Sequence, residues 1–149
     1  MRLLENILTK KKSKTQKKNK SYIPVLSKLN TEAFPTSLIY RVEDEEGNGP
    51  YMGRYDVDEW TEASHVGSHH PTPMSDGIEF WRIRDKHGNS NILCGFRDMD
   101  QLRKWFTCRE LINLYDMGLR VKVYQVNRDY IWHGNMQVVY HKEWAECVG

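Results

Sequence analysis

Hydrophobic and polar residues alternate most regularly over residues 121–126, a run typical of a β-strand with one buried face. Residues 37–42 and 91–96 are short apolar runs that predict two further strands. Residues 130–140 predict one or two more around Gly134. Turn-forming residues separate these segments, so we expect several short strands.

An amphipathic helix is predicted to follow Asp98, whose side chain suits an N-cap. Apolar residues at helical spacing continue as far as Leu114, and the pattern allows a break near Thr107. Gly118 suits the C-terminal end of the helix, because glycine adopts the left-handed conformation there at little cost. The pattern therefore predicts one main helix.

Residues 77–84 are interpreted as one more strand, although their two faces are not cleanly separated. This strand would pair with residues 91–96 as a hairpin, across a turn at residues 85–89. The order of elements predicts an α+β fold, a mostly antiparallel sheet with one main helix packed on it. A long irregular loop is expected at residues 52–76, and loops of this length are usually functional or mobile.

Charge divides the chain into two parts. Residues 1–20 hold eight basic residues and one acidic residue, a net charge of +7, whereas the whole chain carries +2. We therefore expect a basic N-terminal tail, disordered or ordered by a partner, followed by a single domain at residues 21–149. The tail is either a solubilising linker or a weak contact to nucleic acid or another anionic surface. Its candidate contact residues are Lys10, Lys11, Lys12, Lys14, Lys17, Lys18 and Lys20.

The length of 149 residues suits one domain with a hydrophobic core. Cys94, Cys108 and Cys147 form an odd set without close pairing, and neither a secretory signal nor a membrane span is visible. Free thiols in the cytoplasm are the simplest expectation. The sequence does not set the oligomeric state.

Candidate chemistry is sparse. His65, His69 and His70 lie close together, but Gly67 and Pro71 break the regular spacing that metal ligands on a helix would have. Neither a nucleophile with a recognisable base nor a phosphate-binding loop is visible. We therefore predict no catalytic residues, no metal site and no cofactor, and leave open whether the protein is an enzyme.

Polar and aromatic residues gather near the ends of the predicted strands. Arg41 lies near the end of the first strand, and a proline-stiffened loop that begins with His70 comes later. A guanidinium beside aromatic rings, under such a loop, would form a cleft for an anionic aromatic ligand such as a nucleotide. The predicted ligand-binding residues are Tyr40, Arg41, Tyr51, His69, His70 and Gln137.

Two of these residues have a structural alternative. Arg41 can form an ion pair with neighbouring acidic residues, and Gln137 can mark the solvent face of an alternating strand. If Arg41 serves the ligand, its replacement by alanine should impair function and leave folding nearly intact. Trp105, in contrast, is expected in the core.

Five segments together resemble a family of small, uncharacterised proteins from tailed bacteriophages. They are YRVEDEEGNGPY (40–51), HPTPMSDG (70–77), CGFRDMDQLRKWF (94–106), GLRVKVYQV (118–126) and MQVVY (136–140). The resemblance implies a non-catalytic accessory protein with an anti-defence or host-takeover role in the host cytoplasm. Its partner would be a host protein or a nucleotide-type small molecule.

A weaker resemblance is to ADP-ribosyltransferases, which hold NAD with an Arg or His on the first strand. Tyr40 and Arg41 stand at that place, and Gln137 stands where those enzymes carry a glutamate on a late strand. The resemblance implies, as an alternative, a nucleotide-handling enzyme that uses Arg41, His70 and Glu79. Because Gln137 cannot supply the negative charge of the glutamate, we favour the non-catalytic role.

Overall fold

A computed structural model describes residues 35–62, 70–88 and 90–149, and within them six strands form two three-stranded antiparallel sheets. The first sheet has the order β1-β3-β6, with β1 at Thr36–Glu43, β3 at Arg120–Asn127 and β6 at Ala145–Cys147. The second has the order β2-β5-β4, with β2 at Ile92–Gly95, β5 at Val138–His141 and β4 at Ile131–His133. The α+β prediction is confirmed.

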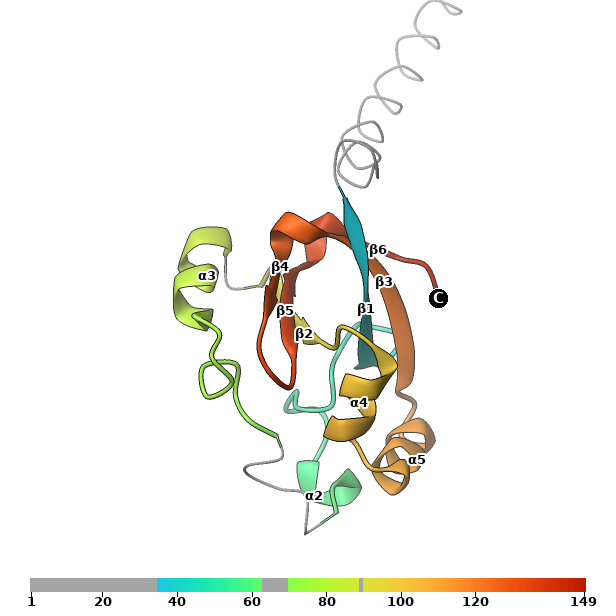
Figure 1. Cartoon of the computed structure of the whole chain (residues 1–149). Helices are drawn as coiled ribbons and strands as arrows, with labels where there is room; N and C mark the ends of the chain where they lie inside the picture. The colour runs from blue at the N-terminus through green and yellow to red at the C-terminus, as the bar shows by residue number, and fades with distance from the viewer. Residues whose placement is uncertain (1–34, 63–69, 89) are drawn as a thin grey trace, which may run out of the picture.

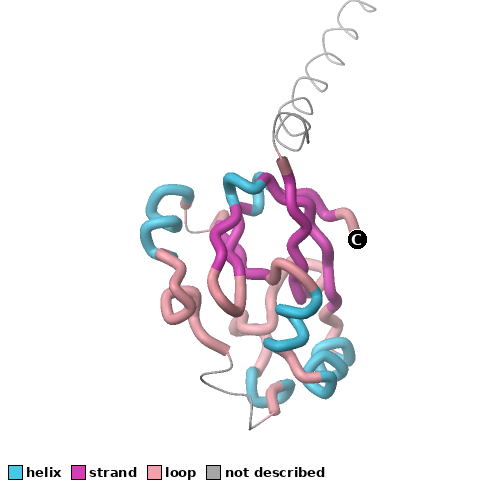
Figure 2. Tube along the Cα trace, viewed as in Figure 1, coloured by secondary structure: helices cyan, strands magenta, loops and turns pink. Residues whose placement is uncertain are grey.

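In the described ranges, four α-helices accompany the sheets: α2 at Val57–Trp60, α3 at Phe80–His87, α4 at Met99–Trp105 and α5 at Cys108–Asp116. Figure 1 shows α2, α4 and α5 gathered at one end of the sheets, with α3 beside the second sheet. The same view, coloured by secondary structure in Figure 2, shows that loops make up much of the chain between the helical end and the strands.

The two sheets are joined by a backbone bridge between Tyr40 and Phe96, whose amides each donate to the other's carbonyl oxygen at 2.8 and 2.7 Å. Gly95 permits this approach of β1 to β2. A Cβ atom there would lie 2.7 Å from a methyl group of Ile39 and 2.9 Å from the Tyr40 carbonyl oxygen. Any larger residue would push the two sheets apart.

The hydrophobic core of the described residues has three parts: one between the sheets, one beneath the helices at one end, and one between α3 and the second sheet, formed by Ile78, Ile83, Ile92 and Val139. Buried residues of both sheets form the first part: Ile39, Val126, Ile131, Val138 and Tyr140. The second part consists of Val42, Trp60, Phe96, Leu102, Trp105, Phe106, Leu114 and Leu119. The core therefore extends from the sheets to the helical end, and β1 contributes Ile39 to the first part and Val42 to the second.

The predicted main helix is two helices, which corrects the single-helix expectation. Phe106 and Thr107 have extended backbone angles, and Thr107 is the N-cap of the second helix, α5. The Thr107 side chain accepts from the Glu110 amide at 3.1 Å, and the Glu110 carboxylate accepts from the Thr107 amide at 2.9 Å. This reciprocal capping box fixes the break, which the pattern had allowed near Thr107. Asp98 caps α4 as predicted.

The strand predicted at residues 77–84 is wrong, because Phe80–His87 is α3. Phe80 and Ile83 lie one helical turn apart and pack with Ile92 and Val139, whereas Trp81 is 56% exposed. A helix separates these apolar positions from the polar ones, which a strand cannot do here. The predicted hairpin therefore does not form, and β2 pairs with β5 instead.

The loop predicted at residues 52–76 contains the short helix α2, and its end is fixed to the second sheet. The Asp76 carboxylate accepts from the amides of Met136 and Gln137 at 2.9 and 3.0 Å. The predicted tail at residues 1–20 lies outside the described residues. None of the described helices has the length and apolarity needed to cross a membrane.

Candidate functional site

A cavity of about 460 Å³ opens beside the bridge between the two sheets. Four of the six predicted ligand-binding residues line it: Arg41, Tyr51, His70 and Gln137. Its volume lies within the range of about 300–1,000 Å³ that is usual for small-molecule sites. Tyr40 is not among the lining residues, and His69 lies outside the described residues.

Arg41 is only 8% exposed, and three acceptors of the protein hold its guanidinium. Its donors reach the Glu43 carboxylate at 2.7 Å, the Cys94 carbonyl oxygen at 2.7 Å and the Gly47 carbonyl oxygen at 3.3 Å. The Glu43 carboxylate also accepts from the Tyr124 hydroxyl. Arg41 therefore ties β1 to β2 and to the acidic turn that follows β1.

This geometry bears out the ion-pair alternative for Arg41. Because Glu43 neutralises the guanidinium at close range, an anionic ligand would have to compete with an internal carboxylate. The expectation that Arg41→Ala leaves folding nearly intact is therefore reversed. The substitution would leave the buried Glu43 carboxylate without its cation.

His70 is a packed residue whose side chain is only 5% exposed. Its ring stacks on Trp105, with centroids 5.1 Å apart and planes within 1°, and on Trp60 at 6.0 Å. Its Nε2 atom lies 2.6 Å from the Trp105 carbonyl oxygen and 4.0 Å from a Glu110 carboxylate oxygen. A carbonyl oxygen can only accept, so Nε2 carries a proton.

The other ring nitrogen of His70 completes a closed set of hydrogen bonds. In the neutral ring, Nδ1 accepts from the Tyr51 hydroxyl at 2.9 Å. That hydroxyl accepts in turn from Trp105 Nε1 at 2.7 Å. Both nitrogens of His70 are thereby engaged within the protein. The arrangement supports a structural wall of the cavity and leaves His70 poorly suited to act as a general base.

Tyr51 is a partly exposed residue whose hydroxyl is held by protein partners. The residue is 48% exposed, yet its hydroxyl lies between Trp105 and His70. Burial raises the pKa of Tyr51 above its ordinary value, and the Trp105 donor partly opposes this change. The hydroxyl therefore stays protonated and continues to donate.

Gln137 is 3% exposed, so the prediction that it marks a solvent face is wrong. Its side-chain nitrogen donates to the Pro71 carbonyl oxygen at 2.8 Å and so holds the proline loop against the second sheet. In the described part of the chain, the fully buried side-chain atoms without a partner are Trp60 Nε1 and Tyr140 Oη. Gln137 lines the cavity, and within the described residues its side chain forms the one hydrogen bond to Pro71.

The remaining walls are mainly apolar, and sequence reasoning assigned most of them to the core or to loops. They are Val42, Pro50, Met52, Pro71, Pro73, Ile92, Leu93, Cys94, Phe96, Trp105 and Phe106. Burial raises the pKa of the Cys94 thiol, and the nearby Arg41 opposes this change. The sequence signal for this side of the cavity was the proline-stiffened loop that begins with His70, which alone does not distinguish a cavity from a core.

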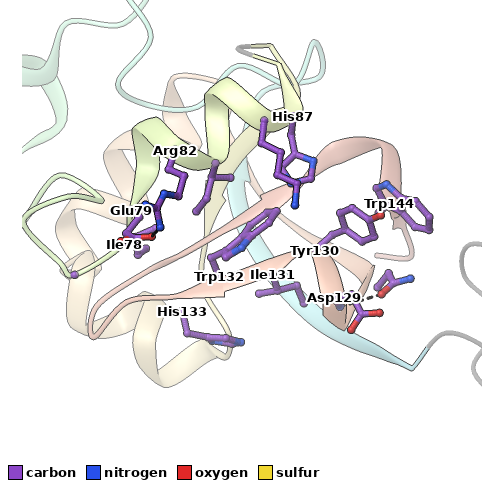
Figure 3. Close-up of a pocket in the computed structure, with 14 residues that line it drawn as sticks. Ile78, Glu79, Arg82, His87, Asp129, Tyr130, Ile131, Trp132, His133 and Trp144 are labelled. Atoms are coloured by element: carbon purple, nitrogen blue, oxygen red, sulfur yellow. Dashed lines mark hydrogen bonds and ion pairs between the residues drawn. The ribbon is translucent and has the colours of Figure 1, made fainter.

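A second cavity, of about 780 Å³, lies between α3 and β4 and was not predicted (Figure 3). The error at residues 77–84 concealed it, because a strand there would have left no helix to form its wall. Glu79 lines this second cavity and not the first. Arg41, His70 and Glu79, the residues of the transferase alternative, therefore do not share one cavity.

Comparison with known proteins places the chain in a class of bacteriophage proteins. Residues 33–149 match the family model described as "Bacteriophage T4 Y00F protein", and the chain belongs to that family. The match supports the phage resemblance and, with it, a phage-encoded accessory protein. The searches of curated proteins and of solved structures gave no match.

Proposed function

We propose that this phage accessory protein acts in the infected cell by binding a nucleotide-type small molecule without catalysis, with the base in the 460 Å³ cavity. The position of Gln137, a polar side chain that lines the cavity among mainly apolar walls, carries the proposal. One acceptor in an apolar pocket suits a flat aromatic ring that has a polar N–H edge, as a nucleobase does.

The base, and not the phosphate, is the part that the cavity favours. The positive charge of Arg41 is balanced by Glu43 at 2.7 Å, so the described residues of the lining offer no uncompensated Lys or Arg to a phosphate. Aromatic side chains at Tyr51, Phe96 and Trp105 present large apolar surfaces to the space. The phosphate or ribose would then lie towards solvent, near the exposed side chain of Met52.

In this proposal the protein sequesters its ligand and leaves it chemically unchanged. The ring nitrogens of His70 are already engaged, and Gln137 is uncharged. An accessory protein of this kind would lower the free concentration of a nucleotide signal in the host. The contact of the N-terminal lysines with nucleic acid remains a separate prediction.

A thermal-shift screen tests the proposal. The probes are the four ribonucleosides, their 5′-monophosphates, NAD and cyclic dinucleotides. We expect at least one nucleoside to raise the melting temperature, because a ligand that binds only the folded state stabilises it by mass action. The matching monophosphate should add little, and chromatography should recover the ligand unchanged. If the cavity instead binds an aromatic side chain of a host protein, no probe should change the melting temperature. That result would contradict the proposal.

Two methionines provide matched variants for this screen. Met52 is 53% exposed and lines the cavity, whereas Met74 is 54% exposed and does not. Neither substitution should disturb folding, because both side chains are on the surface. Met52→Ala should reduce the ligand-induced shift, and Met74→Ala should preserve it. Equal loss in both variants would point to binding elsewhere.

A further inference from the structure

The second cavity runs along the free edge of β4, which is the last strand in the order β2-β5-β4. Residues from both faces of this short strand line the same space: Trp132 on one face, and Ile131 and His133 on the other. Figure 3 shows Trp132 on the side of α3, with Ile131 and His133 on the opposite side of the strand. A space bordered by both faces of a strand must pass its edge.

The hydrogen-bond register shows which backbone groups face that edge. The Gly134 amide donates to the Gln137 carbonyl oxygen at 2.8 Å, and Trp132 pairs with Val139 further along the same ladder. In an antiparallel ladder, hydrogen-bonded and non-hydrogen-bonded pairs alternate. Trp132 therefore bonds to β5 through its backbone, and the backbone groups of Ile131 and His133 point outwards.

The opposite side of β5 agrees with this register. The Lys142 amide donates to the Asn91 carbonyl oxygen at 2.8 Å, and the same ladder pairs Leu93 with Tyr140. By the same alternation, Tyr140 and Val138 direct their backbone groups to β2. The backbone groups of Tyr140 and Val138 are therefore not available to β4. This agrees with the β4–β5 register, in which their partners Ile131 and His133 form non-hydrogen-bonded pairs.

Three backbone groups of β4 remain without a partner in the part of the chain that the structure describes. The Ile131 amide is taken by the Arg128 carbonyl oxygen of the preceding turn. The amide of His133 and the carbonyl oxygens of Ile131 and His133 have no hydrogen bond to a described residue. An open edge of this kind is a template for another strand.

We propose that the free edge of β4 binds an extended segment of a partner polypeptide, which adds to the second sheet as a further strand beside α3. One residue of the segment would exchange two backbone hydrogen bonds with His133, and a residue two positions away would donate to the Ile131 carbonyl oxygen. Main-chain pairing of this type supplies affinity, and pockets for alternate side chains supply specificity.

The walls of the cavity define the chemistry of the segment. Side chains that point towards α3 would meet Ile78, Ile83 and Trp132, so apolar residues are expected at alternate positions. On the same wall, Arg82 already pairs with Glu79 at 3.0 Å, whereas Lys86 forms no ion pair with a described residue. The segment should therefore carry an acidic residue opposite Lys86.

Other occupants fit the same features less well. A single-stranded nucleic acid has no backbone donors and acceptors spaced to match a strand edge, and the carboxylates of Glu79 and Asp129 in the lining would oppose a row of phosphates. A second copy would pair β4 with β4 and bring two His133 side chains together. We therefore commit to a foreign extended segment and treat the second copy as an outcome of the test.

Proline at position 133 supplies the test. Proline lacks an amide hydrogen and is tolerated on edge strands where the amide faces outwards. His133→Pro therefore removes the outward donor without breaking a bond of the fold, whereas His133→Thr removes only the imidazole. Both variants should melt near the wild-type temperature. A variant that did not fold would contradict the assigned register.

The probes are peptides enriched from a displayed library of random sequences by selection against the full chain. They are then synthesised and titrated by fluorescence anisotropy. We expect alternating apolar peptides with an acidic residue, a loss of affinity of at least about tenfold in His133→Pro, and near wild-type affinity in His133→Thr. Lys86→Glu should weaken the acidic peptides selectively.

Three results would overturn the proposal. The first is a selection that enriches no peptide. The second is equal affinity of the peptides for His133→Pro and His133→Thr, which would place binding away from the backbone edge. The third is a wild-type dimer in sedimentation experiments that His133→Pro converts to monomer, which would identify a second copy as the occupant.

Discussion

The Arg41 guanidinium and the Glu43 carboxylate form an ion pair at 2.7 Å, and both residues are less than 10% exposed. They lie two residues apart on β1, so their side chains share one face of the strand. The pair connects β1 to Cys94 of β2 through Arg41, which lines the cavity, whereas Glu43 does not line it. It therefore governs both the assembly of the sheets and the charge that a ligand would meet.

We predict that Arg41→Ala destabilises the protein by about 3–5 kcal/mol, because it leaves the Glu43 carboxylate buried without its cation. Chemical denaturation measures the loss. The double variant Arg41→Met with Glu43→Leu removes both charges and should be less destabilised than Arg41→Ala. If Arg41→Ala retained wild-type stability, the ion pair would have no structural role.

Trp105→Ala should destabilise the protein by about 3–5 kcal/mol as a large-to-small change in the core. The variant also removes the donor to Tyr51 and one of the two rings that stack on His70. Trp105→Phe keeps an aromatic ring and should lose less. Urea denaturation compares the three proteins. A near-neutral effect of Trp105→Ala would show that this wall is not closely packed.

Stability should depend on pH through Asp44. The hydroxyl of Tyr55, assisted by the amide and side chain of Asn48, lowers the pKa of Asp44 from 3.8 to about 2. The unfolded chain therefore takes up this proton before the folded chain does. The stabilising contribution is complete above about pH 4 and is lost as the pH falls towards 2.

The difference in unfolding free energy between wild type and Asp44→Asn should accordingly shrink as the pH is lowered from 5 to 2. Urea denaturation at several pH values measures it. Tyr55→Phe removes the main cause of the shift and should weaken the pH dependence. A difference that stays constant over this range would disprove the assignment.

Gly134→Ala should destabilise the contact between the proline loop and the second sheet. A Cβ atom at this position would overlap the Asp76 carboxylate and lie 2.9 Å from the Asp76 carbonyl oxygen. Asp76 would then lose its hydrogen bonds to the amides of Met136 and Gln137, at a cost of about 1–3 kcal/mol. Gly53→Ala is the matched control, because nothing lies within 4 Å of its Cβ position. Equal melting temperatures for the two variants would contradict this account.

Local signals in the sequence predicted much of the fold. Strict alternation indicated β3, and Asp98 indicated the start of α4 because its short side chain caps a helix locally. Thr107 carried the signal for a second helix, since Glu110 follows it at capping-box spacing. Residues 77–84 misled the analysis, because a short apolar run does not distinguish a strand from a helix until its neighbours are known.

The candidate site was predicted in part. Arg41, Tyr51, His70 and Gln137 meet at one cavity, as expected from their places at strand ends and in the proline loop. Their individual roles were not predictable. The pairing of Arg41 with the Cys94 carbonyl oxygen and the stacking of His70 on Trp105 depend on contacts between segments distant in sequence. Hydrophobic pattern alone cannot supply such contacts.

The indole N–H signals in an NMR titration with the best-binding nucleoside test the central claim most directly. Trp105 lines the 460 Å³ cavity, whereas Trp132 and Trp144 line the second one. The account predicts that the Trp105 signal shifts in a saturable manner while the Trp132 and Trp144 signals stay in place. Shifts confined to Trp132 and Trp144, or no shift at all, would show that the cavity beside Arg41 and Gln137 does not bind the base.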